Sequence, residues 1–327
     1  MTGAALGARL RERDLAAAPA ALNLLESTAP ADREQATALL REVSPAALGG
    51  EARGHIIGVT GPPGAGKSTL LSALLHEWRG AAHEAGGEAD SEGRTVAMLA
   101  VDPSSRRSGG SLLGDRARIE FDPADRGVLI RSTAAGERLG GIAWGTRTAA
   151  QALAAAFDIV VIETVGVGQA ETEVAEVADT VAVVVQPGSG DVLQFLKSGI
   201  MEIPDVLVVT KADLGKPALS ARRDLSAALR SLGKRSTAVI AVSSLPPPSG
   251  IEELVQAIEA HRASIDIPAR RLRARRAGAL TDFLVEHGER GLRALGGRRA
   301  AEGWLSEQDP TLDEAALMAA LEGRMSS

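Results

Sequence analysis

The chain has 327 residues, 45% of them hydrophobic and only 2% aromatic, so it can bury a sizeable core made of aliphatic side chains. A formal charge of −6 is too small to argue for a nucleic-acid partner, and the absence of cysteine excludes disulfides and thiolate metal sites. Neither a run of about 18 apolar residues nor an N-terminal signal pattern occurs, which predicts a soluble cytoplasmic protein without a membrane partner.

The predicted elements begin with an Ala- and Leu-rich helical extension over residues 1–48, with breaks near Pro30 and Pro45. Short apolar runs follow, rich in β-branched residues and separated by segments of helix length. Because these runs are continuous rather than alternating, we predict an α/β fold with a mostly parallel sheet flanked by helices. The seven predicted strands are 55–60, 95–101, 126–132, 157–163, 180–186, 205–210 and 237–242.

Helices are predicted over residues 68–79 and 249–261, and the second of these closes the central domain. Pro268 begins a tail of different composition, with an arginine-rich helix and a final helix over 311–325. Such a tail is too small to bury a large core alone, so we expect it to pack on the main domain or on a second copy of the chain. The predicted parts are the helical extension (1–48), the α/β domain (49–265) and a C-terminal helical arm (266–327).

A glycine-rich turn joins the first predicted strand to the next helix. Its spacing, G-x-x-x-x-G-K-S, and its strand-before, helix-after context are those of a phosphate-binding loop. Backbone N–H groups of such a loop surround the phosphates, and the helix N-terminus adds a favourable dipole. We expect Lys67 to reach the β- and γ-phosphates of a purine nucleotide and Ser68 to bind Mg²⁺. The nucleotide-binding residues predicted here are Gly61, Pro62, Pro63, Gly64, Ala65, Gly66, Lys67, Ser68 and Thr69.

Acidic residues follow two later strands. The strand that ends at Glu163 is followed three residues on by Gly166, the spacing at which a switch-type NTPase places a metal-linked acid and a backbone N–H for the γ-phosphate. Glutamate is longer than the commoner aspartate, which suits contact with the metal through water. Asp102 and Asp115 flank a Gly- and Ser-rich segment that could close over Mg²⁺ and phosphate. A strand-capping acid and an ordinary solvated loop are the alternatives.

A second candidate loop, Thr210 to Asp213, follows the apolar run 206–209. An aspartate here can accept two hydrogen bonds from the guanine ring, which adenine cannot donate, and Lys211 can lay its stem along the base. Thr210 stands where asparagine is usual, and its shorter side chain could lose a bond to the base or to the phosphate loop. Ser243 and Ser244 sit where GTPases place another base-contacting loop. The alternative is a strand followed by a polar turn.

Taken in order, these segments resemble one family, the methylmalonyl-CoA mutase-associated GTPases of the MeaB/ArgK type. The resemblance covers roughly residues 50–265 and rests on GVTGPPGAGKSTL, AVDPSS with SGGSLLGDR, ERLGGIAWGTR, ETVGVGQAE, QPGSGDVLQFLKSGIMEIPD and TKADL. It implies a Mg²⁺-dependent GTP hydrolase that binds GTP and GDP. It further implies a chaperone that gates cofactor loading of an adenosylcobalamin-dependent acyl-CoA mutase and protects that mutase.

The resemblance also implies roles for particular residues. Val167 follows Gly166 where many small GTPases carry a water-orienting glutamine, so we expect slow intrinsic hydrolysis that a partner stimulates. The tail, residues 266–327, corresponds to a homodimer arm. The remaining implied roles are Lys67 as the catalytic P-loop lysine, Ser68, Asp102, Asp115 and Glu163 as metal and switch residues, Asp213 as the guanine reader, and Asp191, Gln194 and Lys197 as a third switch that senses the mutase.

Other functions remain open at this point. An ATPase or kinase-like regulator of arginine or ornithine transport would have to accept adenine, against which Asp213 argues. A metal-insertion GTPase would be expected to carry Cys or His clusters, whereas this chain has five scattered histidines that we interpret as structural or solvated. The arginine-rich tail could bind nucleic acid, but interleaved acidic residues favour a solvated helix face.

Overall fold

The structure, a computed structural model, describes residues 1–27, 29–83, 93–102, 119–134, 144–164, 170–188 and 203–325, without the side chains of 81–83, 102, 134 and 170–172. The chain forms two compact units. The first contains residues 1–54, 143–156 and 266–327, and the second contains residues 55–142 and 157–265. The predicted N-terminal extension and C-terminal arm therefore lie in one unit, together with a helix from the middle of the chain.

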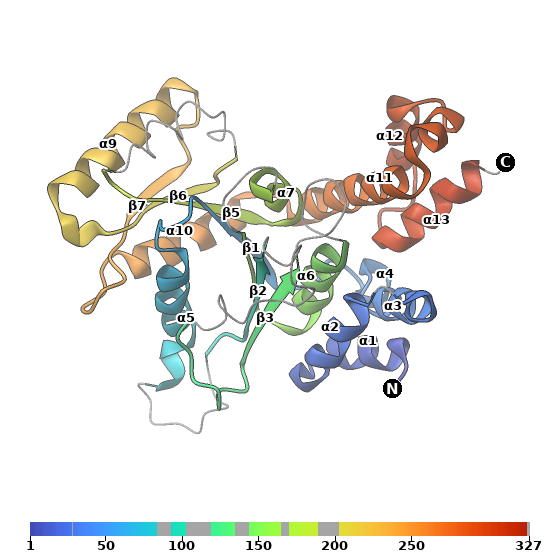
Figure 1. The fold of residues 1–327 in the computed structure, drawn as a ribbon, viewed down its shortest axis with the longest axis horizontal. Coiled ribbons are helices and arrows are strands. Elements are labelled where there is room, and N and C mark those ends of the chain that lie inside the picture. The colour runs from blue at the N-terminus through green and yellow to red at the C-terminus, as the bar shows by residue number, and fades with distance from the viewer. Residues whose placement is uncertain are drawn as a thin grey trace. The chain divides into compact units, whose positions relative to one another are not determined.

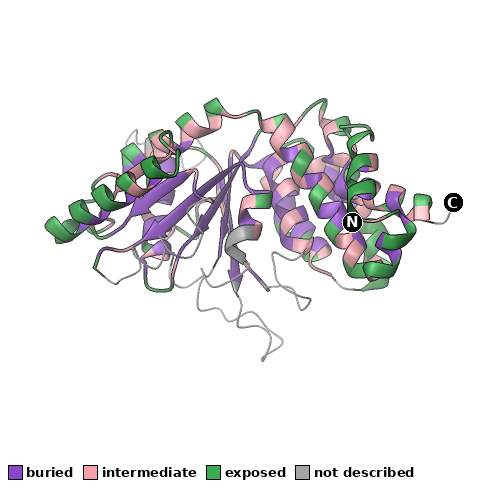
Figure 2. Cartoon of the chain, turned by 90° about the horizontal axis from the view of Figure 1, so that it is seen from above, coloured by how far each residue is buried: buried purple, intermediate pink, exposed green. Residues whose placement is uncertain are grey.

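The second unit is built on a seven-stranded parallel sheet with the order β3-β2-β4-β1-β5-β6-β7 (Figure 1). Each strand lies within two residues of its predicted bounds, so the predicted α/β architecture is confirmed. The inner strands are buried along their length (Figure 2), as continuous apolar runs require, whereas the edge strands β3 and β7 are mostly half-buried. The seven strands are β1 (His55–Thr60), β2 (Val96–Asp102), β3 (Val128–Ala134), β4 (Ile159–Glu163), β5 (Thr180–Val185), β6 (Val206–Val209) and β7 (Ala238–Ala241).

Helices cover both faces of this sheet. Side chains of β1 alternate between them: Ile57 and Val59 join the core beneath α5 (Lys67–His83) and α10 (Ile251–Ser264). Gly58 faces α7 (Ala170–Val177), where an added Cβ would lie 2.4 Å from a Val174 methyl, so only glycine allows this close approach. The other helical elements in the described part of this unit are η5 (Ala212–Leu214) and α9 (Lys216–Ser231).

The first unit is helical. Pro30 and Pro45, the predicted breaks, occupy the first turns of α3 and α4, where a missing N–H costs nothing. Leu280, Phe283 and Leu317 belong to an apolar core formed by the last three helices. The elements are α1 (Gly3–Arg11), η1 (Leu15–Ala17), α2 (Ala18–Leu25), α3 (Pro30–Glu42), α4 (Pro45–Leu48), α6 (Trp144–Ala156), α11 (Ile267–Ala294), α12 (Arg298–Ser306) and α13 (Glu314–Met325). In the described part of the chain, no helix has the length and apolar character to cross a membrane.

The arginine-rich start of α11 is partly buried, so its interpretation as a solvated face is wrong for two residues. Arg271 donates to the backbone carbonyls of Ala52 and Gly54, at 2.6 and 2.5 Å. Arg275 is also buried and donates to the carboxylate of Glu51 at 2.9 Å. These contacts hold the arm to the segment before β1 within the first unit.

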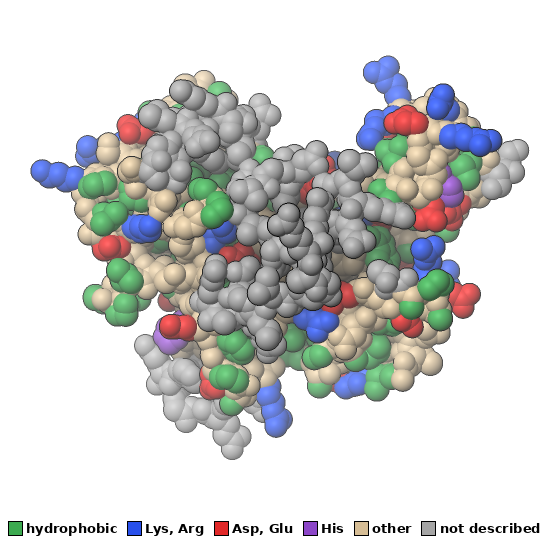
Figure 3. Space-filling model, in the orientation of Figure 1, with side chains coloured by type: hydrophobic (Ala, Val, Ile, Leu, Met, Phe, Trp, Pro, Cys, Tyr) green, Lys and Arg blue, Asp and Glu red, His purple; other side chains and the backbone are tan. Residues whose placement is uncertain are grey.

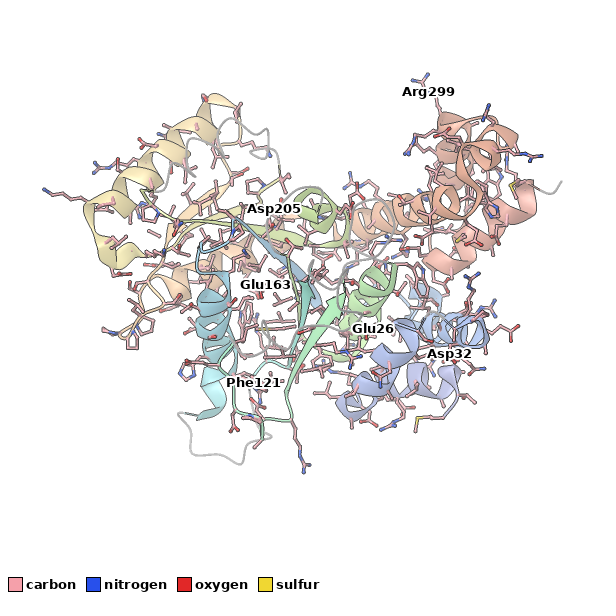
Figure 4. All side chains as sticks on the ribbon, in the orientation of Figure 1. Glu26, Asp32, Phe121, Glu163, Asp205 and Arg299 are labelled. Carbon is pink, nitrogen blue, oxygen red and sulfur yellow. The ribbon has the colours of Figure 1, made fainter. Side chains whose placement is uncertain are left out.

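Two histidines lie in a polar chain at the amino ends of the strands. His55 Nε2 and His261 Nδ1 both hydrogen-bond the Thr180 hydroxyl, at 2.8 and 2.9 Å. His261 Nε2 lies 3.2 Å from a carboxylate oxygen of Asp205, which Figure 4 labels. Both histidines therefore have structural roles, as predicted.

Candidate nucleotide-binding site

The phosphate loop follows β1 and ends where α5 begins at Lys67. Gly61, Gly64 and Gly66 all have positive φ angles, of 144°, 78° and 88°. An added Cβ on Gly61 would lie 2.0 Å from the carbonyl oxygen of Val184, so the loop can pass β5 only with glycine there. The loop thus has the geometry that presents backbone N–H groups at a helix N-terminus.

The side-chain ammonium group of Lys67 is held by the backbone of this loop. Its side chain is 8% exposed, and Nζ donates to the carbonyl oxygens of Gly61 and Pro62, at 2.7 and 3.2 Å. The ammonium group is therefore positioned by the loop itself. A phosphate bound by the loop would lie within its reach and would receive its positive charge.

A hydroxyl and a carboxylate meet beside the loop. Ser68 Oγ donates to Glu163 Oε1 at 3.3 Å, because β4 pairs directly with β1 and brings Glu163, which Figure 4 labels, level with Val59. Hard oxygen donors of this kind are the ligands that Mg²⁺ prefers, usually together with water and phosphate oxygens. The donor set therefore fits the predicted magnesium ion.

Of the other predicted switch residues, the structure describes only the backbone of Asp102. The backbone of Asp102 lies at the carboxyl end of β2, two residues beyond Ala100, which pairs with Glu163. This register places Asp102 at the same edge of the sheet as the phosphate loop. Its side chain is outside the described atoms, and so are the predicted residues Asp115, Gly166, Asp191, Gln194 and Lys197.

Two threonines that sequence reasoning missed join β4 to the phosphate loop. The Thr164 hydroxyl donates to the Thr60 hydroxyl at 2.8 Å, and its backbone N–H donates to the carbonyl of Val59 at 3.0 Å. Both side chains are fully buried. They fix the start of the segment after Glu163 against the last residue before the loop. In the sequence, the only indication of this contact was that each threonine lies at the end of a predicted strand.

Thr210 also contacts the phosphate loop. Its hydroxyl donates to the carbonyl of Ala65 at 2.6 Å and lies 3.2 Å from the carbonyl of Val185. The anticipated loss of a bond to the phosphate loop therefore does not occur. Threonine makes the contact because β6 pairs with β5, which places Thr210 directly beneath the loop.

The two predicted base loops are joined to each other. The exposed carboxylate of Asp213 accepts a hydrogen bond from Ser243 Oγ at 3.0 Å, and the N–H of Ala212 donates to the carbonyl of Val242 at 2.9 Å. Lys211 adopts a left-handed conformation with φ of 55°, and its Nζ donates to the side chain of Gln186. A buried serine thus orients the carboxylate expected to read guanine, while the neighbouring Ser244 is half-buried.

We expect Thr210→Val to weaken GDP binding by about fivefold, since loss of one buried hydrogen bond costs about 1 kcal/mol. Valine keeps the volume of threonine but cannot donate to Ala65. Thr210→Ser keeps the hydroxyl and serves as the control, and Thr210→Asn should bind GDP as well as the wild type or better. Titration calorimetry measures all three, and a wild-type affinity for Thr210→Val would show that the contact does not support the loop.

Comparison with known proteins identifies relatives along most of the chain. The family model described as methylmalonyl-CoA mutase-associated GTPase MeaB matches residues 15–287. A protein of Pyrococcus abyssi named as a GTPase is 40% identical over 275 residues, which are 82% of this chain and 78% of that protein. The mitochondrial methylmalonic aciduria type A homolog of Mus musculus is 38% identical over 228 residues, 66% of this chain and 52% of its own length. The crystal structure of an LAO/AO transport system kinase matches 99% of this chain and 98% of its own, with a TM-score of 0.62 and 25% identity.

Proposed function

Because this chain belongs to the family of methylmalonyl-CoA mutase-associated GTPases, we propose that it is the chaperone of an adenosylcobalamin-dependent acyl-CoA mutase, methylmalonyl-CoA mutase or a relative. The chain is a GTPase, and the proposed role is to couple GTP hydrolysis to cofactor loading and protection of that mutase. The main structural support for nucleotide hydrolysis is that Lys67, Ser68 and Glu163 lie together at the carboxyl ends of β1 and β4.

Hydrolysis requires that charge be neutralised where it develops on the phosphates. The N–H groups of the loop and the Lys67 ammonium would surround the β- and γ-phosphates. Ser68 would hold Mg²⁺ directly and Glu163 would hold it through water, with Asp102 and Asp115 as the further acids of the proposed site. When bound, the ion would supply further positive charge to the phosphates.

The proposed guanine reader gives a selective test. Asp213→Asn should weaken GDP binding by at least about a hundredfold and improve xanthosine diphosphate binding, because asparagine can donate to the xanthine carbonyl. The exposed acid Asp224, changed to asparagine, is the matched control and should leave both affinities unchanged. Calorimetry with the two nucleotides tests this prediction. If Asp213→Asn still prefers the guanine nucleotide as the wild type does, Asp213 does not recognise the base.

Equal wild-type affinity for ATP and GTP would favour the alternative function, a kinase-like transport regulator.

The partner role rests on the segment after β5. We assign the mutase-sensing switch to Asp191, Gln194 and Lys197, by the family resemblance of the residues from Gln186 onwards. Asp191→Ala and Lys197→Ala should keep intrinsic GTP turnover but lose most of the stimulation by a cognate mutase. Turnover with and without the mutase, beside a melting curve, tests this, and equal stimulation of mutant and wild type would contradict the assignment.

The proposal includes a homodimer formed through residues 266–327 and a cytoplasmic location. The apolar core around Phe283 and Leu317 supports the arm as a folded element able to carry an interface.

A further inference from the structure

Helix α9 carries an unusual concentration of positive charge for a chain of net negative charge. From residue 216 to residue 235 the sequence has six basic residues and a single acid, Asp224. Five of the six are exposed: Lys216, Arg222, Arg223, Arg230 and Arg235. Figure 3 shows basic side chains (blue) at the margin of the molecule where Figure 1 draws α9.

Among the described residues, these five cations differ from several other basic residues in having no carboxylate partner. In the same unit, Arg79 pairs with Asp125 at 2.6 Å and Arg94 pairs with Glu259. Among the described residues, by contrast, no carboxylate lies within 4.0 Å of the charged groups of the five exposed cations on and after α9. Their charge is therefore not neutralised within the described part of the chain and is available to another molecule.

Three of these cations lie on one face of α9 and form a single stripe along the helix. The helix buries Ala218, Ala221, Leu225 and Leu229. Lys216, Arg223 and Arg230 recur every seven residues, which is two helical turns, so they share the opposite face. Leu219, 45% exposed, lies on this stripe between the first two cations.

We propose that this exposed face of α9 is a docking surface for an acidic patch on a protein partner, namely the mutase of the proposed function, on which this inference rests. The apolar side of α9 is already buried, so the helix cannot lie in a bilayer as an interfacial helix does. The stripe also lacks the aromatic side chains on which nucleic-acid bases stack. A protein surface with carboxylates for the arginines and an apolar spot for Leu219 fits it best.

The position of α9 gives this surface a consequence for nucleotide binding. Only Leu214 and Gly215 separate Asp213 from Lys216, and η5 packs against α9. Leu214 is itself 52% exposed. A partner bound along the stripe would therefore contact the turn that follows the guanine-reading residue, and docking there would change the rate of GDP release.

The test is binding of a purified methylmalonyl-CoA mutase to the full chain loaded with GDP, at low and at physiological salt. Arg223→Glu combined with Arg230→Glu should weaken binding by about tenfold or more, mainly through the association rate, and the difference should shrink with added salt. Arg33→Glu with Arg41→Glu, two exposed arginines of α3 changed in the same way, should bind as the wild type does. Arg223→Lys with Arg230→Lys keeps the charge and should keep the affinity.

The outcomes separate this surface from the proposed function. Equal mutase binding by the wild type and by Arg223→Glu/Arg230→Glu would overturn the docking surface alone, whereas a wild type that neither binds nor responds to the mutase would overturn both. Loss of a dimer in the charge-reversed variant, measured by light scattering, would assign the face to a second copy instead. Binding of the wild type but not the variant to phosphatidylserine vesicles, with mutase binding unaffected, would assign it to a membrane.

Discussion

Lys67→Ala is expected to lower the rate of GTP hydrolysis by more than about a hundredfold, equivalent to about 3 kcal/mol or more of transition-state stabilisation. The ammonium group is held over the phosphate loop by the carbonyls of Gly61 and Pro62, so its charge is already in place when the nucleotide binds. Removing it leaves the developing negative charge on the β- and γ-phosphates without its nearest fixed cation.

Single-turnover hydrolysis, with nucleotide binding and melting temperature measured beside it, checks this prediction. Lys67→Met tests whether the lost charge or the lost packing matters, because methionine keeps most of the side-chain length. Lys216→Ala removes an exposed lysine of the same unit and should retain full intrinsic turnover. Turnover of Lys67→Ala near that of the wild type would exclude Lys67 from the catalytic machinery.

The strands and the phosphate loop could be predicted because neighbouring residues encode them. Most strands are apolar runs, and the loop is defined by glycines whose left-handed conformations the structure contains at Gly61, Gly64 and Gly66. The order of the strands was not predicted, since a run such as Val181–Val185 pairs equally well with several others until the helices and loops choose its neighbours.

Contacts between distant parts of the site could not be predicted. The bond from Thr210 to Ala65 spans 145 positions, and the bond from Ser243 to Asp213 spans 30. Each depends on which strands are adjacent, and the sequence pattern around each residue shows only a strand end followed by polar residues. For that reason, the substitution of the usual asparagine by Thr210 suggested a lost contact where the fold retains one.

Arginine was the residue type whose environment was hardest to predict. Arg271 and Arg275 are buried and bind carbonyls and a carboxylate, whereas Arg223 and Arg230 on α9 are exposed. All four lie in helices with many charged neighbours, so helical periodicity alone does not distinguish them. Burial of an arginine depends on the acceptors that the rest of the fold brings to its guanidinium group.

A third arginine of the helical unit has a largely buried side chain, which is 13% exposed. Arg147 of α6 donates to Asp282 of α11 at 2.6 Å and to Glu314 of α13 at 2.8 Å. The Glu314 side chain is 1% exposed, and an added Cβ on Gly278 would lie 2.5 Å from its carboxylate. Arg147 thus pairs with two carboxylates from two other helices, and the Glu314 carboxylate packs closely against Gly278.

Arg147→Met is therefore expected to destabilise the protein by about 3–5 kcal/mol at pH 8, because both carboxylates stay buried without a positive partner. Desolvation by burial raises the pKa of Glu314 to about 7 from its ordinary 4.5, the charge of Arg147 opposes this rise, and the charge of Asp282 adds to it. A raised pKa means that the folded state binds the proton more tightly. The stabilisation is fully present below pH 4.5 and is lost as the pH rises towards 7.

Without Arg147 the pKa of Glu314 should rise further, so the destabilisation of Arg147→Met should be largest above pH 7 and smaller at pH 6. Adding Glu314→Gln removes the second negative charge while keeping the shape of the side chain, and the double variant should recover part of the lost stability at pH 8. Denaturant unfolding of the wild type, both single variants and the double variant, at pH 6 and pH 8, gives the four free energies needed. A loss in Arg147→Met that is the same at both pH values and is not reduced by Glu314→Gln would show that Arg147 stabilises the unit by packing alone.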